Sequence, residues 1–489
     1  MDSPTVSCHE GLTALDTLIP PTYIRFLTLF KTSDSKSALA RLEAGTRRLV
    51  SEFPFLAGYV FTGPVPGDPN SGCHIIPPRD SDADSVIAAV QRVSESYQNV
   101  YPGGQAHPAL DTAHLPLQPI ADIANPSPIF RLQITLFSDG VGLGFALHHN
   151  VMDAIGAGTV VKALGSCCCG AGPGTDIGLD LDTLTPLQYS ARVSLNKLTQ
   201  GVHNPELDRS RYGLQPHPGP IMFDLDGLKW LPPPSAFTLS TTKIQDLKSH
   251  LNTLIGQSES LQKQFGPASW ISTNDTLVAL IWLCYNRAKR RSEPPPSTTP
   301  PSAAINPGIC MAANIRTRVH PPLPSNFLGN AAVPVKPALD SQPLLSAIGH
   351  ASLFTDEVVP QRLRDDALCQ VALAVRQSVS RVNSDYTRDI SSLAQNSKVP
   401  LIYEYNPDTN ISSWRDSAVY DAFFGDELGF PVDVYLHVPA VGYFIVAPKR
   451  REPDDSWEIH AVLHPTTAAC LRSDAIWSSV LSHPPPSGE

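Results

Sequence analysis

His149 and Asp153 are the residues whose types and spacing point most directly to chemistry. They stand in the run HHNVMD, residues 148–153, directly after an apolar segment, residues 141–147, that has the length and composition of a buried strand. A neutral imidazole held at the end of a rigid strand can take a proton from a substrate group. Spacing alone favours a structural histidine, and Asp153 could also be the N-cap of a helix that begins at Ala154. The rest of the chain has to decide between these interpretations.

The two adjacent histidines are not equivalent. Successive side chains of a strand point to opposite faces, so only one of them can face a substrate. His149 stands four residues before Asp153, and we expect it to be the candidate base. We expect His148 to lie in the core or to support its neighbour.

Hydrophobic periodicity predicts the elements that position this pair. Alternation favours strands over residues 23–30 and 130–137, the second with one polar face. Ser138-Asp139-Gly140 turns that strand into the more apolar residues 141–147. Apolar residues at helical spacing predict helices over residues 35–50 and 156–164.

The second half begins after a change in composition. Prolines accumulate and periodicity fades over residues 201–234, which is typical of a linker between domains. We therefore expect an N-terminal domain over residues 1–205, a linker over 206–235 and a C-terminal domain over 236–489. A strand exchange between the two domains is expected near residues 390–430.

Further elements are expected in that second half. Residues 236–239 and 244–254 read as a strand and a helix. Residues 273–291 predict an amphipathic helix with a polar cap and a basic last turn. Residues 293–307 are rich in proline and are expected to form a surface loop.

Composition excludes several classes of protein. The chain has 489 residues, 42% of them hydrophobic and 17% charged, a net charge of -10 and a sequence pI near 5.8. This acidic balance without a basic block argues against nucleic acid as a partner. No apolar stretch reaches membrane-spanning length, and the first residues show no secretory signal.

The cysteines suit neither a disulfide framework nor a metal site. Their number is nine, and three of them are adjacent, Cys167, Cys168 and Cys169. We expect these three to be small buried side chains of a helix. The chain is therefore expected to be a reduced, cytoplasmic protein without a structural metal, and a monomer.

Several further motifs accompany the histidine in a fixed order. They are Leu15-Asp16, PFLAG over residues 54–58, TND over 273–275, NIRTR over 314–318, NFLGN over 326–330, ISSW over 411–414 and FFGDELGF over 423–430. In this order and spacing the chain resembles the BAHD acyltransferases, and within them the trichothecene 3-O-acetyltransferase-like branch of fungal secondary metabolism. The resemblance covers about residues 12–481, and it makes His149 the expected catalytic residue.

The resemblance implies a fold and an activity. The fold is α/β, with two chloramphenicol-acetyltransferase-like domains of mixed β-sheets flanked by helices and an active-site channel between them. The activity is transfer of an acyl group, acetyl by default, from acyl-CoA to a hydroxyl or amine of a small secondary metabolite. His149 acts as general base in a direct transfer within a ternary complex, and acyl-CoA is a co-substrate, with no bound cofactor. Two alternatives are a condensation-type enzyme that uses a carrier-bound acyl group and a non-catalytic relative that binds a metabolite.

The resemblance also implies roles for other residues. Asp153 points away from the channel and holds its loop through an arginine. Ser412 and Trp414 could donate to the oxyanion of the tetrahedral intermediate, and Trp414 could equally be a core aromatic. The residues expected to shape the channel or to be structural are Gly329, Asn330, Arg316, Gly425 and Gly429.

Two positions depart from the family pattern. Ala154 replaces the usual glycine after the aspartate, which would be strained only at a positive φ. Phe423 replaces an acidic residue that is expected to pair with an arginine of the NIRTR motif. Arg316 or Arg318 must therefore have another acceptor, for which Asp421 or Asp426 is a candidate.

The negative net charge conflicts with an anionic donor. The phosphates of acyl-CoA require a locally basic rim at the channel mouth. The candidate basic clusters are residues 289–291 and residues 449–451.

Overall fold

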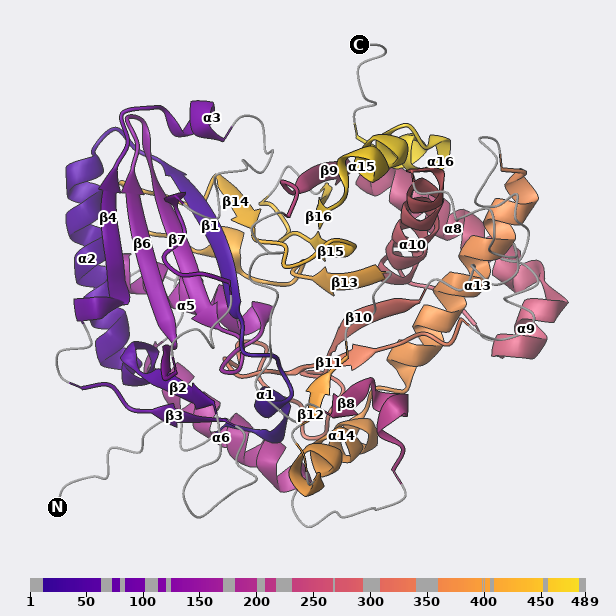
Figure 1. Cartoon of the computed structure of the whole chain (residues 1–489), viewed down its shortest axis with the longest axis horizontal. Helices are drawn as coiled ribbons and strands as arrows, with labels where there is room; N and C mark the ends of the chain where they lie inside the picture. The colour runs from indigo at the N-terminus through magenta and orange to yellow at the C-terminus, as the bar shows by residue number, and fades with distance from the viewer. Residues whose placement is uncertain are drawn as a thin grey trace.

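Two large mixed β-sheets, each covered by helices, form the bulk of the described chain, and two small sheets accompany them (Figure 1). The computed structural model describes residues 12–62, 73–79, 84–101, 113–119, 125–169, 181–199, 207–216, 231–266, 269–292, 308–339, 359–397, 399, 401–404, 409–451 and 456–482. The predicted loop over residues 293–307 lies outside this part of the chain, as does most of the predicted linker over residues 201–234.

The first sheet carries the candidate histidine. Its strand order is β14-β1-β7-β6-β4, and its only parallel neighbours among the described strands are β4 and β6. The bounds are β1 (Tyr23–Lys31), β4 (Ile87–Arg92), β6 (Phe130–Leu136), β7 (Gly140–His148) and β14 (Asp433–Leu436). The strands and the hairpin predicted from alternation are confirmed.

The predicted polar face of β6 is present but is not exposed. Arg131, Gln133 and Thr135 are 8%, 7% and 0% exposed. Gln133 donates to the carbonyl of Ala113, and Thr135 lies 3.3 Å from a ring nitrogen of His114. A segment remote in sequence therefore covers this face, which alternation along one strand cannot reveal.

Helices α2 (Ser35–Glu52) and α5 (Ala154–Cys169) pack together on one face of the first sheet (Figure 1). The contact is close because Gly45 of α2 faces the cysteines of α5: a Cβ at Gly45 would lie 2.3 Å from Sγ of Cys168. Cys167 and Cys168 are buried. The prediction of small buried side chains in a helix is confirmed for these two, whereas Cys169 is only partly buried.

The second sheet has the order β11-β10-β13-β15-β16-β9. Its strands are β9 (Ser235–Leu239), β10 (Ile309–Asn314), β11 (Ala332–Val335), β13 (Thr409–Ser413), β15 (Tyr443–Val446) and β16 (Trp457–Val462). The helices that pack with it are α8 (Thr241–Gln257), α10 (Thr273–Ser292), α13 (Gln361–Ser380), α15 (Pro465–Arg472) and α16 (Ala475–Val480).

Helix α10 has the predicted bounds, but the prediction that it is amphipathic is wrong. Every residue from Asp275 to Ala288 is buried. The cause is its position, because α8, α13, α15 and α16 all contact it (Figure 1). Even its polar residue Arg287 is enclosed, paired with Asp474 at 2.9 Å.

Shorter elements complete the described chain. They are α1 (Ala14–Thr17), β2 (Tyr59–Thr62), β3 (Cys73–Ile76), α3 (Tyr97–Val100), β5 (Ser127–Pro128), α6 (Leu181–Thr199), β8 (Leu214–Pro216), α9 (Glu259–Phe265), α14 (Ser384–Asn396) and β12 (Leu401–Tyr403). Short 3₁₀ turns cover Pro54–Ala57, Asp84–Val86, Arg209–Tyr212 and Val419–Asp421. Strand β8 pairs with β12, which ties a described part of the predicted linker to the second half.

One strand of the C-terminal half belongs to the first sheet. Strand β14, from the C-terminal half, pairs antiparallel with β1, with Phe26 opposite Leu436 and Leu29 opposite Asp433. The chain that leads into it also packs in the first core, through Trp414 and Phe424. The domain boundaries predicted from the sequence stay a prediction.

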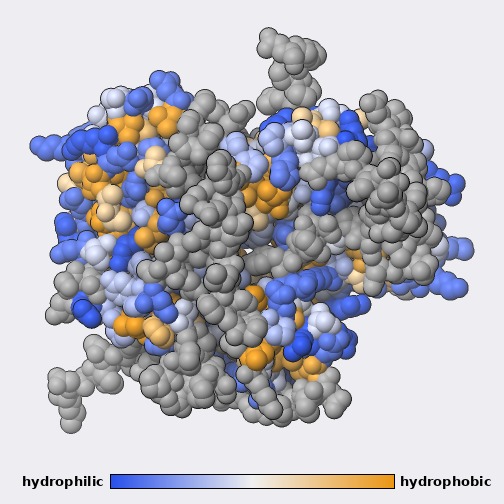
Figure 2. Space-filling model, in the orientation of Figure 1, coloured by the Kyte–Doolittle hydropathy of each residue, from blue (hydrophilic) through white to orange (hydrophobic). Residues whose placement is uncertain are grey.

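The described residues on the visible face are mostly polar. Figure 2 shows hydrophilic side chains over both sides of the visible face, with smaller apolar areas among them. Large apolar side chains that are exposed lie on separate segments, for example Val90 on β4, Tyr189 on α6 and Trp270 before α10. No helix within the described residues is both long enough and apolar enough to cross a membrane.

Candidate active site

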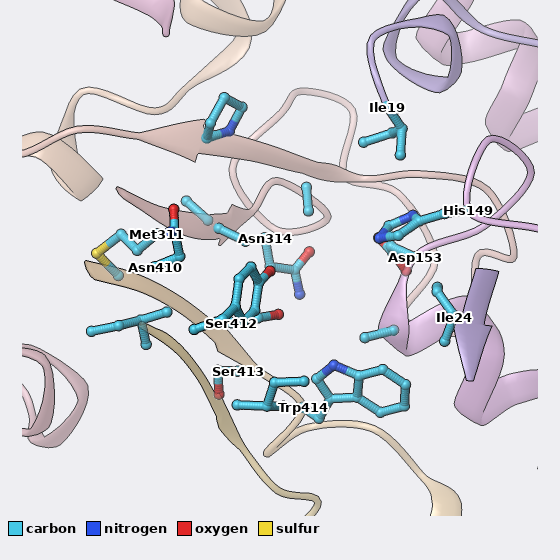
Figure 3. A pocket seen from close by; sticks show the side chains of 18 of the residues that line it. Ile19, Ile24, His149, Asp153, Met311, Asn314, Asn410, Ser412, Ser413 and Trp414 are labelled. Atoms are coloured by element: carbon cyan, nitrogen blue, oxygen red, sulfur yellow. The ribbon is translucent and has the colours of Figure 1, made fainter. Parts of the chain in front are cut away.

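A cavity of about 1010 Å³ lies between the two sheets and is lined by residues of both halves. The first half contributes the loop after β7, and the second half contributes β10, β11 and β13. Figure 3 shows His149 on one side of the cavity, Ser412 on the opposite side, Asn314 between them and Trp414 below. Four of the motifs that carried the family resemblance thus meet the His149 loop at one place, namely those over residues 273–275, 314–318, 326–330 and 411–414.

His149 is fixed by its main chain and presents its ring to the cavity. Its N–H donates to the carbonyl of Thr22 at 2.8 Å, and its carbonyl accepts from Nδ2 of Asn330 at 2.8 Å. Nδ1 of the ring is enclosed and makes no hydrogen bond of ordinary geometry among the described residues, which leaves Nε2 to face the cavity (Figure 3). A ring nitrogen held in this way can accept a proton from a bound substrate.

The surroundings of His149 favour the neutral ring. Burial lowers its pKa, while the main chain of His149 and Met152, the carboxylate of Asp153 and the Asn330 side chain act in the opposite direction without outweighing burial. An imidazole with a lowered pKa is unprotonated at neutral pH. It is therefore in the form that a general base requires.

His148 is a core residue, as the alternation of the strand predicts. It is 0% exposed, its Nε2 lies 3.0 Å from the hydroxyl of Ser127, and its Nδ1 accepts from the N–H of Asn150 at 3.3 Å. Burial lowers the pKa of this imidazole to about 3. His148 therefore stays neutral and does not line the cavity.

Asp153 has both of the structural roles that the sequence left open. Its Oδ1 accepts from the N–H groups of Ile155 and Gly156, at 3.1 and 3.0 Å, so it caps α5. Its two oxygens also form a bidentate ion pair with Arg316, with Nη–O distances of 2.9 and 2.8 Å. Burial alone would raise the pKa of Asp153, but the Arg316 guanidinium and the main-chain donors hold it below its usual value. No hydrogen bond joins this carboxylate to the ring of His149 within the described residues.

Arg316 is paired although position 423 holds a phenylalanine in place of the acidic residue of the family pattern. Besides Asp153, its guanidinium donates to the carbonyls of Phe327 and Gly329, at 2.7 and 3.2 Å. The candidate acceptors Asp421 and Asp426 are therefore not its partners, and that expectation was wrong. Arg318 instead donates to the carbonyl of Val379 at 3.1 Å.

The segment around Phe423 is a tight turn remote from the cavity. Gly425 and Gly429 have positive φ values of 87° and 67°, which favour glycine, and the N–H of Gly429 donates to the carbonyl of Gly425 at 2.7 Å. The acidic residue that does form an ion pair here is Glu427, with Arg41 of α2. The two glycines therefore have a structural role.

The alanine after the aspartate is unstrained. No described residue other than glycine has a positive φ, so Ala154 begins α5 in an ordinary conformation. This departure from the family pattern costs the backbone nothing.

Asn330 and Gly329 sit side by side but differ in role. Asn330 lines the cavity, whereas Gly329 does not. A Cβ at Gly329 would lie 2.5 Å from the ring of Phe327, so the residue must be small. The structure therefore separates a wall residue from a packing residue.

Ser412 and Trp414 both line the cavity, at the end of β13. Trp414 is 6% exposed, and its ring packs edge-on against Phe26 with centroids 5.5 Å apart. Its indole nitrogen nevertheless faces the cavity (Figure 3). Among the described residues, neither this nitrogen nor the Ser412 hydroxyl has a hydrogen-bond partner. Trp414 is thus a core aromatic residue whose indole N–H can also donate a hydrogen bond into the cavity.

Asp16 is a site residue whose role sequence reasoning missed. It is 0% exposed, and its carboxylate accepts from Asn330, Arg192 and both donors of Thr13. Leu15-Asp16 stood out as a motif, but only the fold brings it beside the His149 loop.

The basic clusters predicted for the donor mouth do not line the cavity. The cationic side chains that do are Arg25, Arg316, Arg318 and Arg415. In the predicted clusters, Arg450 pairs with Asp433 and Glu458, and Arg451 stacks on the ring of Phe430. Arg450 and Arg451 are thus used within the fold, and a role of either cluster at the donor mouth stays a prediction.

Comparison with known proteins agrees with the fold. A model of the trichothecene 3-O-acetyltransferase-like N-terminal domain matches residues 22–168, and a model of the Transferase family matches residues 228–475. The chain is 31% identical over 485 residues to O-acetyltransferase ptmV of Penicillium ochrochloron, which covers 96% of this chain and 95% of that protein. It is 25% identical over 516 residues to fumigaclavine B O-acetyltransferase easN of Aspergillus fumigatus, covering 96% and 97%.

Solved structures share the fold. That of F. sporotrichioides TRI101 complexed with coenzyme A and T-2 superimposes with a TM-score of 0.67 at 18% identity, covering 96% of this chain and 97% of that one. Vinorine synthase gives a TM-score of 0.59 at 17% identity, covering 96% and 93%. The chain therefore belongs to the BAHD acyltransferase family, in its trichothecene 3-O-acetyltransferase-like branch.

Proposed function

We propose that this acyltransferase transfers an acetyl group from acetyl-CoA to a hydroxyl or amine of a small secondary metabolite, with His149 as general base. The observation that carries the proposal is the neutral ring of His149, fixed by its main chain at the edge of a cavity that both halves line. The relatives' names support the chemistry: several are O-acetyltransferases, and one is a communesin N16 acyltransferase of Penicillium expansum. Hydroxyl acceptors therefore have the stronger support.

The reaction needs one base and no covalent enzyme intermediate. Nε2 of His149 removes the proton of the acceptor as its oxygen or nitrogen attacks the thioester carbonyl carbon. The tetrahedral intermediate then collapses, the carbon–sulfur bond breaks, and the imidazolium returns the proton to the thiolate of CoA. Both substrates must be bound together, because the proton passes from one to the other through a single ring.

The oxyanion of that intermediate needs donors on the far side of the carbonyl carbon from His149. Ser412 and Trp414 both line the cavity, and the indole nitrogen of Trp414 faces into it (Figure 3). Preorganised donors of this kind stabilise developing charge in a site that excludes bulk water. We assign both residues to the oxyanion.

The phosphates of the donor have a favourable place where Arg318 lines the cavity. Thr317 beside it is exposed, so this wall reaches the surface. Arg376 lies near Arg318 and shares the single carboxylate of Asp275, which leaves an excess of positive charge. Such an excess attracts an anionic donor to an otherwise acidic protein.

The acceptor is expected to be largely apolar. Ile19, Ile24, Met311, Val333 and Ile445 line the cavity among a few amide and hydroxyl groups. A cavity of this composition binds a compact carbon skeleton and orients it by a small number of hydrogen bonds.

We also propose that the protein is a cytoplasmic monomer with the domain boundaries predicted from the sequence.

The test is a transfer assay with a panel of hydroxylated and amine-bearing fungal metabolites. We expect acceptor-dependent release of the CoA thiol and a product heavier by one acetyl group, both abolished in His149→Ala. Transfer from an acyl carrier protein but from no acyl-CoA would instead support a condensation-type enzyme. Binding of a metabolite without transfer from either donor would support the non-catalytic alternative.

A further inference from the structure

Asn314, the last residue of β10, is a polar residue of the cavity wall to which the proposed mechanism gives no role. Its side chain lies in the cavity between Ser412 and His149 (Figure 3). It is partly exposed, in contrast to the buried Ala313 before it and Ile315 after it. Its amide group is therefore accessible to a molecule that fills the cavity.

The orientation of this amide is fixed. Its Oδ1 accepts from the main-chain N–H of Arg316 at 3.0 Å and from Nη1 of the same residue at 3.4 Å. Both partners are donors only, so the oxygen must face them and the NH₂ group must face away. Within the described residues, Nδ2 of Asn314 has no hydrogen-bond partner.

The group that orients the amide is itself rigid. Arg316 is 1% exposed and is held by Asp153 and by the carbonyls of Phe327 and Gly329. The guanidinium that anchors the loop of His149 thus also sets the direction of the Asn314 amide. A donor preorganised in this way does not have to reorient when charge develops.

Asn314 lies level with the oxyanion donors. Strands β10 and β13 run parallel, and their pairing ends where Met311 faces Ile411. Asn314 stands three residues beyond Met311, and Trp414 stands three residues beyond Ile411. The cavity occupies the space where the two strands are no longer paired, with Ser412 and Trp414 on one side and Asn314 on the other.

We propose that Asn314 donates a hydrogen bond from Nδ2 to the carbonyl oxygen of the acyl-CoA thioester and to the oxyanion that forms from it. This inference rests on the proposed function, because it assigns a third donor to the same tetrahedral intermediate. No proton is transferred by Asn314. The oxygen gains charge as the acceptor attacks and loses it as the thiolate leaves, and the amide stabilises that charge throughout.

The kinetic test uses Asn314→Asp, which keeps an oxygen for Arg316 but replaces the donor with an acceptor. We expect kcat to fall about 10²-fold, with the affinity for CoA, measured by calorimetry, changed by less than about threefold. Asn314→Ala should lose a similar amount. Asn99→Asp, the same change at an exposed residue of α3 outside the cavity wall, serves as the control for added charge. An Asn314→Asp variant with wild-type kcat would overturn the inference.

A spectroscopic test needs no acceptor. Acetyl-CoA labelled with ¹³C at the carbonyl is bound to His149→Ala and to the double variant with Asn314→Ala, and the carbonyl stretch is read by difference infrared spectroscopy. Loss of a donor should move the band to higher frequency in the double variant. The same frequency in both proteins would contradict the role of Asn314, whereas failure of acetyl-CoA to bind His149→Ala in calorimetry would contradict the proposed function itself.

Discussion

Asn330 joins the main chain of His149 to the carboxylate of Asp16 through a single nitrogen. Its Nδ2 donates to the carbonyl oxygen of His149 at 2.8 Å and to Oδ1 of Asp16 at 2.9 Å. Asp16 also pairs with Arg192 of α6 at 3.2 Å, and all of these groups except the His149 ring are buried. The position of the candidate base therefore depends on charges that lie behind the cavity wall.

Replacing Asp16 should destabilise the whole protein. Asp16→Asn leaves Arg192 buried beside a neutral partner, and breaking a buried ion pair in this way costs about 3–5 kcal/mol. We expect a corresponding loss in the free energy of unfolding in urea. The double variant Asp16→Asn with Arg192→Met removes the orphaned charge and should recover part of that loss. Equal stability of Asp16→Asn and the wild type would show that the pair contributes nothing.

His149→Ala should remove the general base and leave the fold intact. General bases contribute about 10²- to 10⁴-fold to rate, so we expect kcat to fall by that amount while CoA still binds in calorimetry. The matched control is His148→Asn, at the neighbouring residue outside the cavity wall. A His149→Ala enzyme that keeps more than a few per cent of wild-type turnover would rule out this role for the ring.

Asp153→Asn should lower both stability and activity. The change breaks the bidentate pair with Arg316 and weakens the cap of α5, at a cost of about 3–5 kcal/mol. Thermal melting and turnover are measured on the same preparation. An unchanged melting temperature with no turnover would mean that the carboxylate acts directly on His149 rather than through the fold.

His148 makes stability depend on pH. Its pKa is about 3 in the folded protein and near the ordinary value of about 6.5 in the unfolded chain. Between these values the unfolded state binds one more proton, so the free energy of unfolding should fall by about 1.4 kcal/mol for each pH unit below about 6. The slope between about pH 6 and about pH 4, measured by urea unfolding, should be smaller by this amount in His148→Asn. Equal slopes in the two proteins would contradict the assignment.

Arg318→Gln should weaken donor binding without changing the chemistry. The Michaelis constant for acetyl-CoA should rise, and the effect should be largest at low salt, where charges are least screened. The constant for the acceptor should not change. Arg450→Gln is not a suitable control, because that arginine holds Asp433 and Glu458. Arg388→Gln is suitable, because this partly exposed arginine of α14 pairs with Asp385 and does not line the cavity. If Arg318→Gln and the wild type had the same Michaelis constant for acetyl-CoA at every ionic strength, the phosphates would bind elsewhere.

The predictable parts of this protein are those that neighbouring residues determine. The β6–β7 hairpin and α2 follow from alternation, turn residues and helical spacing within one segment. Strand geometry predicts that only one of the two adjacent histidines faces the cavity. The choice of His149 needed more, namely its spacing to Asp153 and the ordered motifs elsewhere in the chain.

The parts that sequence reasoning missed depend on contacts between remote segments. The burial of α10 requires four other helices, and the partner of Arg316 lies 163 residues away. The same holds for Asp16, which meets Asn330 across 314 residues. Periodicity along one segment contains no information about such partners. For this reason the sequence did not identify the acceptor of Arg316.

The pairing of β14 with β1 has a consequence for how the chain can fold. The edge of β1 that pairs with residues 433–436 stays open until that part of the chain has left the ribosome. Closing this contact requires a loop of about 400 residues, and such non-local pairing is slow. An open strand edge is also a site for pairing with other chains. The first sheet therefore cannot be completed early in synthesis. Premature termination would leave a fragment in which the edge of β1 is unpaired and can associate with other chains.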